Sequence, residues 1–290
     1  MNKIMIVFIV KMSQNFSSAN KELNFDDSLD NFEFLFKDIK TKSPSLKDAL
    51  MEMFLNAQLS KDDSQKIYDD LMLHCTNRIN DKWEAIKQEH PNISRDDALV
   101  ISSYTYEPLQ MYEKYSPYRL LNSSLVATNR KNGVKNVAKY LYLFLRTLRG
   151  LKKCKKNCLF RGINYKVKLA KDPNNTKYIP YAIGNKKIFW PFTSTSDDES
   201  VANCFIGNGT GTKFKIEGDN LWGYDITLFN VCKEKEILLE PESKYVVENI
   251  KEGNIIEVTC KLIDKPQILQ ICNFISKKKV NIFILCFSVL

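Results

Sequence analysis

Two glutamates separated by one residue stand just before an apolar run near the C-terminal end of the chain. Glu234 and Glu236 precede Ile237-Leu238-Leu239, and Pro241 ends the run. We expect a buried strand over 236–239, with both carboxylates on one side, because alternate side chains of a strand face the same way. Carboxylates beside an apolar strand are costly unless they act on a cation or a reacting group. Solvated charges at an exposed strand start are the alternative.

An arginine lies inside a second apolar run, Leu159-Phe160-Arg161-Gly162-Ile163. A buried guanidinium requires an anion, and either a neighbouring glutamate or a ligand phosphate suits its planar fork. Gly162 lets another group approach the backbone closely. A structural ion pair and an anion-binding site both remain open from this run alone.

Four successive hydroxyl residues, 193–196, follow an aromatic segment. We expect Ser194 to face the functional side of a strand and its two threonine neighbours to face away. Ser196 and Glu199 have the spacing of a capping box, so Ser196 is expected to cap a helix. No histidine stands where it could act as the base of a serine nucleophile. The glycine-rich segment 207–211 precedes a strand-like run, so we expect a turn there and not a phosphate-binding loop.

The composition excludes several classes of protein. The 290 residues include 44% apolar and 27% charged residues, which favours a folded chain over a disordered one. The net charge of +9 is spread along the chain apart from short lysine runs, so we expect solvated lysines and no nucleic-acid partner. The eight cysteines contain one close pair, Cys154 and Cys158, and the chain has two histidines. We expect no metal, whereas disulfides and free thiols both remain open.

The elements that position these residues change character near residue 150. Helical periodicity dominates the first half, with helix starts expected at Ser60 and Ser94 and a loop marked by Pro108 and Pro117. The second half consists of short β-rich runs. Helices are expected over 29–39, 46–54, 60–75, 94–104 and 134–148, and strands over 158–163, 187–195, 212–216, 237–239, 244–247 and 255–262. This order predicts an α+β fold, with a helical region packed on a β-rich core.

The three motifs, taken in order, resemble those of the arginine-specific mono-ADP-ribosyltransferases, including their ecto-enzyme and toxin-like members. An arginine–glycine strand, a Ser-Thr-Ser strand and a Glu-x-Glu segment form the R-S-E signature of that family. The flanking segments 118–122 and 223–229 fit as well. The resemblance covers roughly 101–247 and implies an NAD-binding ADP-ribosyltransferase core.

The resemblance also implies a role for each residue. Arg161 is expected to hold the NAD+ phosphates, and the Gly162 backbone the nicotinamide amide. Ser194 is expected to orient Glu236, the catalytic residue that binds the ribose and stabilises the oxocarbenium ion. Glu234 is expected to activate the acceptor guanidinium. Phe205 is expected to lie against the nicotinamide.

The expected function is therefore NAD+-dependent transfer of ADP-ribose to arginine side chains of target proteins. NAD+ is the substrate, and the partner is a protein with an exposed arginine that the segment 227–233 contacts. Two alternatives stay open, an NAD glycohydrolase that uses water as its main acceptor and a catalytically silent binding module of the same fold.

Apolar segments near both ends of the sequence are candidates for targeting signals. Residues 4–10 are apolar and a small-residue segment ends at Ala19, which fits a leader over 1–22 and a secreted or cell-surface protein; a cytoplasmic protein is the alternative. A helical region over 23–150 and a catalytic core over 151–265 follow. The hydrophobic tail, 266–290, is too short in its apolar part to span a bilayer, so a membrane anchor and a docked strand remain open.

Overall fold

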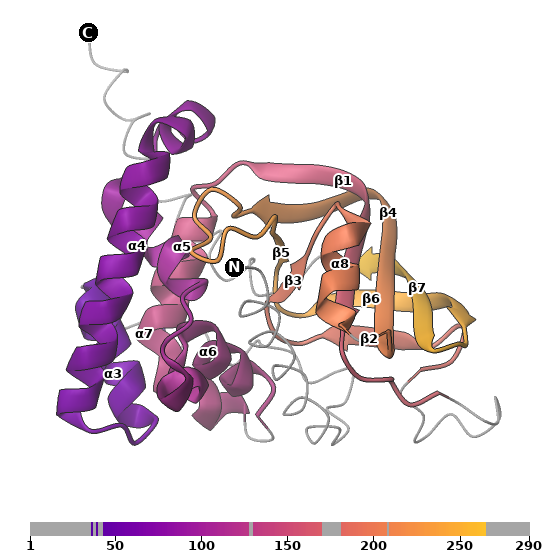
Figure 1. Ribbon diagram of the computed structural model, residues 1–290, viewed down its shortest axis with the longest axis horizontal. Helices are drawn as coiled ribbons and strands as arrows, with labels where there is room; N and C mark the ends of the chain where they lie inside the picture. Colours follow the sequence, from indigo (N-terminus) through magenta and orange to yellow (C-terminus); the bar gives the residue numbers. More distant parts are fainter. Residues whose placement is uncertain are drawn as a thin grey trace, which may run out of the picture.

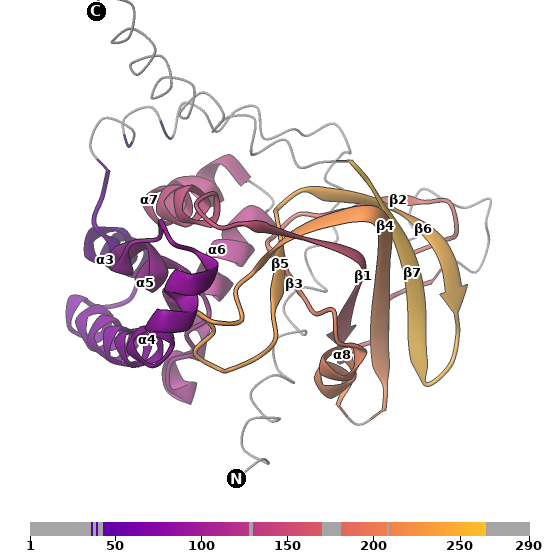
Figure 2. The same ribbon diagram turned by 90° about the horizontal axis from the view of Figure 1, so that it is seen from above.

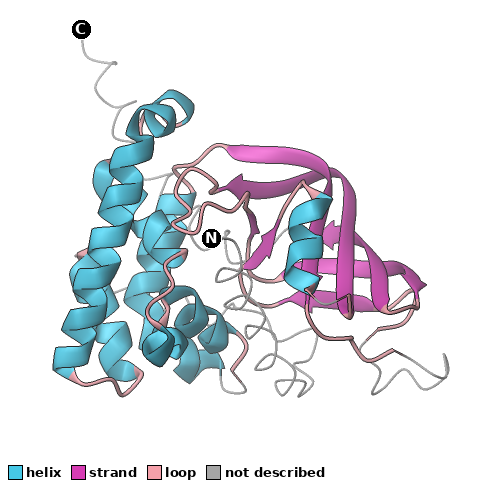
Figure 3. Ribbon diagram, in the orientation of Figure 1, coloured by secondary structure: helices cyan, strands magenta, loops and turns pink. Residues whose placement is uncertain are grey.

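The computed structural model describes residues 36, 39, 43–127, 130–169, 181–207 and 209–264. The helices before residue 150 lie on one side of the molecule, and the sheet lies on the other with one later helix, 199–206, packed on it (Figure 1, Figure 3). The predicted α+β class is confirmed, since the last helix of the first half ends at Leu148 and the first strand begins at Lys153. The predicted leader, the C-terminal tail and most of the helix expected over 29–39 lie outside the described residues.

The helices begin where the sequence places their caps. The Ser60 and Ser94 hydroxyls accept hydrogen bonds from the third backbone N–H of their helices, at 3.1 and 3.0 Å. The loop expected at Pro117 is wrong, because this proline starts a helix, where its missing N–H costs nothing. None of the described helices is long and apolar enough to cross a membrane. The helices are α3 Leu46–Asn56, α4 Lys61–Glu89, α5 Arg95–Tyr104, the 3-10 helix η3 Gln110–Tyr115, α6 Pro117–Leu125, α7 Arg130–Leu148 and α8 Glu199–Ile206.

The strands form one sheet in the order β2-β6-β7-β4-β5-β3, with β1 paired to β4. Neighbours are antiparallel except β4 and β7. The single strand expected over 187–195 is wrong: it is two strands that pair with different neighbours, β2 with β6 and β3 with β5, and Pro191 lies between them. The strands are β1 Lys153–Ile163, β2 Lys186–Phe189, β3 Thr193–Thr195, β4 Gly211–Asp225, β5 Ile237–Leu239, β6 Ser243–Lys251 and β7 Ile255–Asp264.

The glycine-rich segment is the predicted turn. It connects α8, which ends at Ile206, to β4, which begins at Gly211. Gly207 and Gly209 have φ angles of 72° and 76°, which glycine adopts without steric cost. The turn lets α8 fold back onto β1 (Figure 1).

Aromatic side chains join the helices to the sheet. Tyr104 of α5 stacks on Phe144 of α7 at 4.6 Å, and Phe144 meets Phe192 edge to face at 5.0 Å. Phe192 directly precedes β3 and is buried with the helical residues, as is Leu238 of β5. The view from above shows the helices beside the β3 and β5 end of the sheet (Figure 2). This packing fixes β3 and β5 against the helices, and the site lies along that junction.

Candidate active site

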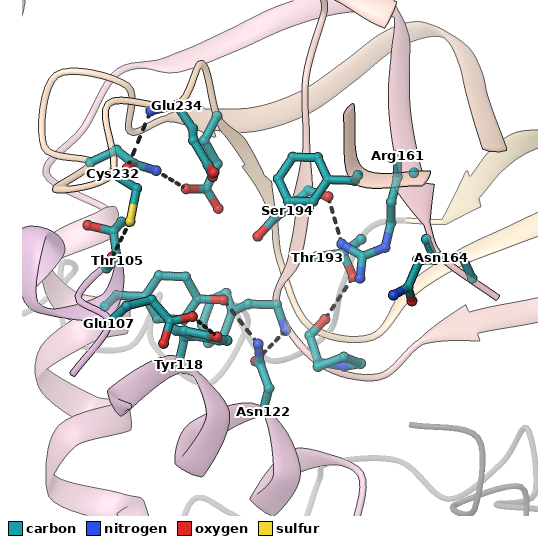
Figure 4. A pocket seen from close by; sticks show the side chains of 18 of the residues that line it. Thr105, Glu107, Tyr118, Asn122, Arg161, Asn164, Thr193, Ser194, Cys232 and Glu234 are labelled. Atoms are coloured by element: carbon teal, nitrogen blue, oxygen red, sulfur yellow. Dashed lines mark hydrogen bonds between the residues drawn. The ribbon is translucent and has the colours of Figure 1, made fainter. Parts of the chain in front are cut away.

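A cavity of about 690 Å³ lies between the helices and the sheet (Figure 4). All six residues that the sequence analysis selected line it, although they come from four separate parts of the chain: Arg161, Gly162, Ser194, Phe205, Glu234 and Glu236. Its size is typical of a pocket for a small organic ligand.

Arg161 projects from β1 into one end of the cavity. Its Nη1 donates a hydrogen bond of 2.8 Å to the backbone oxygen of Ser194, which joins β1 to β3. Burial lowers the pKa of the guanidinium. Among the described residues no carboxylate forms a salt bridge with Arg161, so the structural ion pair that the sequence left open is not observed there. The guanidinium thus offers a positive charge to an anion in the cavity.

Gly162 is required by the packing of α8. A Cβ added at this position would lie 1.9 Å from the backbone oxygen of Ala202. The close approach expected at Gly162 therefore comes from a helix of the chain itself. It brings Phe205, one turn of α8 further on, to the wall of the cavity.

Ser194 lines the cavity from β3, as the alternation predicts, and Thr195 is buried and does not line it. The expectation that Thr193 also faces away is wrong, because Thr193 lines the cavity as well. The expected capping role of Ser196 is wrong, because Asp198 caps α8 and accepts a hydrogen bond of 3.0 Å from Ser200 N–H. Ser196 exchanges two backbone hydrogen bonds with Phe160, of 2.7 and 2.9 Å. The chain therefore stays extended through Ser196, and the helix starts later.

The two glutamates do not share a strand, which corrects the expected geometry. β5 begins at Ile237, and Glu234 and Glu236 lie in the irregular segment before it. Lys233 has a φ angle of 61°, which turns the chain just before Glu234. Both glutamates nevertheless line the cavity.

Glu236 is buried, with 7% of its surface exposed. Burial raises the pKa of its carboxyl group, and hydrogen bonds with Ser194 and Asn230 and the charge of Arg161 act in the opposite direction. The Asn230 amide donates to Glu236 Oε2 at 2.7 Å. Asn230 was not predicted from the sequence, where its only signal is its position as a polar residue at the end of the mostly apolar segment 226–229.

Glu234 has a pKa that burial, together with the charges of Glu236 and Glu107, raises to about 7. At neutral pH its carboxyl group is therefore close to half ionised and able to accept or release a proton.

The segment that carries both glutamates is held by the helices. The Arg78 guanidinium of α4 donates to Thr227 O at 2.8 Å, and Val231 N–H donates to Thr105 Oγ1 at 2.9 Å. The Thr227 hydroxyl in turn accepts from Glu236 N–H at 3.1 Å. The contacts of Arg78 and Thr105 could not be predicted from the sequence, since their partners lie more than a hundred residues away along the chain.

The described residues include free cysteines and no group of metal ligands. Cys75, Cys154, Cys158, Cys204, Cys232 and Cys260, the cysteines of the described segments, are free thiols. Over the described ranges, no three His, Cys, Asp or Glu side chains are grouped as metal ligands. The site is formed by a guanidinium, a hydroxyl, an amide and carboxylates.

The chain is similar to known proteins over most of its length. The family model of NAD:arginine ADP-ribosyltransferases matches residues 41–266. Among solved structures, the type III effector XopAI from Xanthomonas axonopodis pv. citri is 14% identical, with a TM-score of 0.51 over 84% of this chain and 95% of that one. No curated protein matches the chain.

Two further structures match at lower TM-scores. The ADP-ribosyltransferase HopU1 of Pseudomonas syringae pv. Tomato is 21% identical, with a TM-score of 0.47 over 67% of this chain and 87% of its own. The Vis toxin, an ADP-ribosyltransferase from Vibrio splendidus, is 19% identical, with a TM-score of 0.45 over 68% and 86%.

Proposed function

Because the chain belongs to the NAD:arginine ADP-ribosyltransferase family, we propose that it transfers ADP-ribose from NAD+ to arginine side chains of target proteins and releases nicotinamide. The observation that carries this proposal is one cavity with a half-buried guanidinium at one end and two carboxylates at the other. The diphosphate of NAD+ is anionic and requires the positive guanidinium, whereas the ribosyl centre becomes cationic and requires the negative carboxylates.

The NAD+ side of the site uses residues of the sheet and of α8. Arg161 binds the diphosphate, for which its planar fork of N–H donors is suited. The Gly162 backbone binds the nicotinamide amide, and Phe205 lies against the nicotinamide ring. Ser194 orients Glu236, and its hydroxyl lowers the pKa of that carboxyl group.

Glu236 acts on the leaving step. The C1′–N bond of NAD+ breaks, its electron pair goes to nicotinamide, and positive charge develops on the ribose. A preorganised carboxylate in a buried site stabilises that charge, as in glycoside hydrolysis. Glu236 also accepts a hydrogen bond from the ribose 2′-hydroxyl.

Glu234 acts on the acceptor. A guanidinium nitrogen forms a new bond to C1′ and loses one proton, which Glu234 takes up. Its pKa of about 7 is suited to this role, since a general base is most effective when its pKa lies near the working pH.

Catalysis belongs to the core over 151–265, and the helical region over 23–150 positions the acidic end of the cavity. The segment 227–233 contacts the target protein. Export of the protein, with cleavage near Ala19 in the leader predicted over 1–22, is a further part of the proposal, supported by the apolar N-terminal segment. An N-terminus beginning after Ala19 in the mature protein would support it, and an intact Met1 would contradict it.

The experiment that tests the function is incubation with labelled NAD+ and agmatine, a small molecule with a guanidinium group. We expect nicotinamide release together with labelled agmatine. If nicotinamide is released but neither agmatine nor any protein tested as acceptor is labelled, the protein is an NAD glycohydrolase. Neither product would identify a catalytically silent binding module.

A further inference from the structure

A third carboxylate lines the acidic end of the cavity. Glu107 follows α5 and belongs to the helical wall, opposite the segment that carries Glu234. Figure 4 shows the two side chains projecting from opposite sides of the same end, far from Arg161. The charge of Glu107 contributes to the raised pKa of Glu234, which places the two groups within electrostatic reach.

The two carboxylate oxygens of Glu107 differ in their hydrogen-bond partners. Oε1 accepts a hydrogen bond from the Tyr118 hydroxyl and lies 3.6 Å from Arg119 Nη2. The same Nη2 lies closer, at 2.5 Å, to Glu113, so Arg119 is shared between two carboxylates. Oε2 is buried and has no hydrogen-bond partner among the described residues. Tyr118 therefore fixes the carboxylate and leaves one oxygen open to a donor.

Positive charge compensates the acidic end only in part, because Arg119 is shared between Glu107 and Glu113. Among the described residues, Glu234 forms no salt bridge, and the nearby Lys235 is paired with Asp197. Partly buried carboxylates with too little positive charge beside them are unfavourable, and burial raises the pKa of both Glu107 and Glu234. A cation that binds between them removes this cost.

We propose that Glu107 and Glu234 together bind the guanidinium of the acceptor, one carboxylate on each edge, which makes Glu107 a specificity-determining residue. A guanidinium presents five N–H donors in one plane and satisfies two carboxylates from opposite sides, which an ammonium group cannot do in the same geometry. The site would accordingly favour arginine over lysine side chains. This inference rests on the proposed function.

Glu107→Gln tests the inference because it removes the charge and keeps the shape. A hydrogen bond to a charged group is stronger than one to a neutral group, so we expect the KM for agmatine to rise about tenfold or more. The KM for NAD+ should change less than twofold, because Arg161 lies at the other end. Glu107→Asp, which keeps the charge, should give an intermediate KM for agmatine.

Glu113→Gln is the matched control. Glu113 binds the same Arg119 but does not line the cavity. Both KM values should stay at the wild-type level in this variant. A similar rise in the KM for agmatine would mean that Glu107 acts only through Arg119, and would overturn the inference.

Two other outcomes would also be decisive. A wild-type KM for agmatine in Glu107→Gln, or an equal rise of both KM values, would overturn the inference and leave the proposed function intact. A wild-type protein that neither releases nicotinamide nor labels agmatine would overturn the proposed function, and this inference with it.

Discussion

The two ends of the cavity are built in different ways. At the cationic end, Arg161 and Ser194 belong to regular strands, and the Arg161 side chain donates to the Ser194 backbone. At the acidic end, Glu234 and Glu236 lie in an irregular segment that side chains of the helices and Asn230 hold in place. One end depends on the sheet ladder and the other on contacts between distant parts of the chain.

This difference has a consequence for function. A strand residue keeps its place as long as its neighbours pair, so the cationic end is rigid and suits a substrate that does not vary, the NAD+ diphosphate. The acidic end has few backbone ladder bonds, and its carboxylates carry raised pKa values because of burial. We therefore expect variants at the acidic end to change the reaction and its pH dependence, and variants at the cationic end to change NAD+ binding.

The largest effect is expected for Glu236→Gln, at the acidic end. This change removes the charge that faces the developing oxocarbenium ion. Loss of one preorganised electrostatic group costs about 10²–10³-fold in kcat. Nicotinamide release and agmatine labelling should fall together, measured at saturating NAD+. A release rate close to that of the wild type would show that the leaving step does not depend on this carboxylate.

At the cationic end, Arg161→Lys keeps the charge and removes the planar fork. We expect the KM for NAD+ to rise about 30–100-fold with a smaller change in kcat, because two parallel hydrogen bonds to the phosphates become one. Initial rates at varied NAD+ measure both constants. If kcat falls and the KM for NAD+ stays constant, the cationic end acts in the reaction and not mainly in NAD+ binding.

Asn230→Ala tests the support of Glu236. Loss of a hydrogen bond to a charged group costs about 1.5–3 kcal/mol, or about 10–100-fold in kcat. Asn230 lowers the pKa of Glu236, so its removal should shift the acidic limb of the pH–rate profile to higher pH. A lowered rate with an unshifted profile would reduce Asn230 to a structural role. Asn230→Asp is a harsher companion variant, since it places a second carboxylate beside the first.

A smaller effect is expected from pH alone. Glu234 has a pKa of about 7, so its basic form increases as the pH rises through 7. The ratio of agmatine labelling to nicotinamide release should therefore rise about five- to tenfold between pH 6 and pH 8, as the ionised fraction does. The ratio removes the effect of Glu236, which influences both products. A flat ratio in the wild type would contradict the role of Glu234 as acceptor base.

The same division separates what the sequence could and could not predict. The periodicities of 159–163 and 193–195 predicted strands that bring Arg161 and Ser194 to the cavity, although Thr193 lines it as well. The residues of the cationic end followed from these patterns. Both glutamates were also predicted from the sequence, but on one strand. The turn at Lys233 was not predicted, because residues 231–236 include no glycine, proline, asparagine or aspartate that would mark it. Asn230, Arg78 and Glu107 could not be found, since their roles depend on tertiary contacts that local patterns do not encode.

The measurement that tests the account most directly is the comparison of both products in Glu234→Gln and the wild type at pH 8. Nicotinamide release and agmatine labelling are followed in the same reaction, with Glu236→Gln as the variant that lacks both. We predict that Glu234→Gln continues to release nicotinamide and no longer labels agmatine, because Glu234 acts on the acceptor and not on the leaving step. Full agmatine labelling in Glu234→Gln, or an equal loss of both products, would contradict the division of work between the two carboxylates.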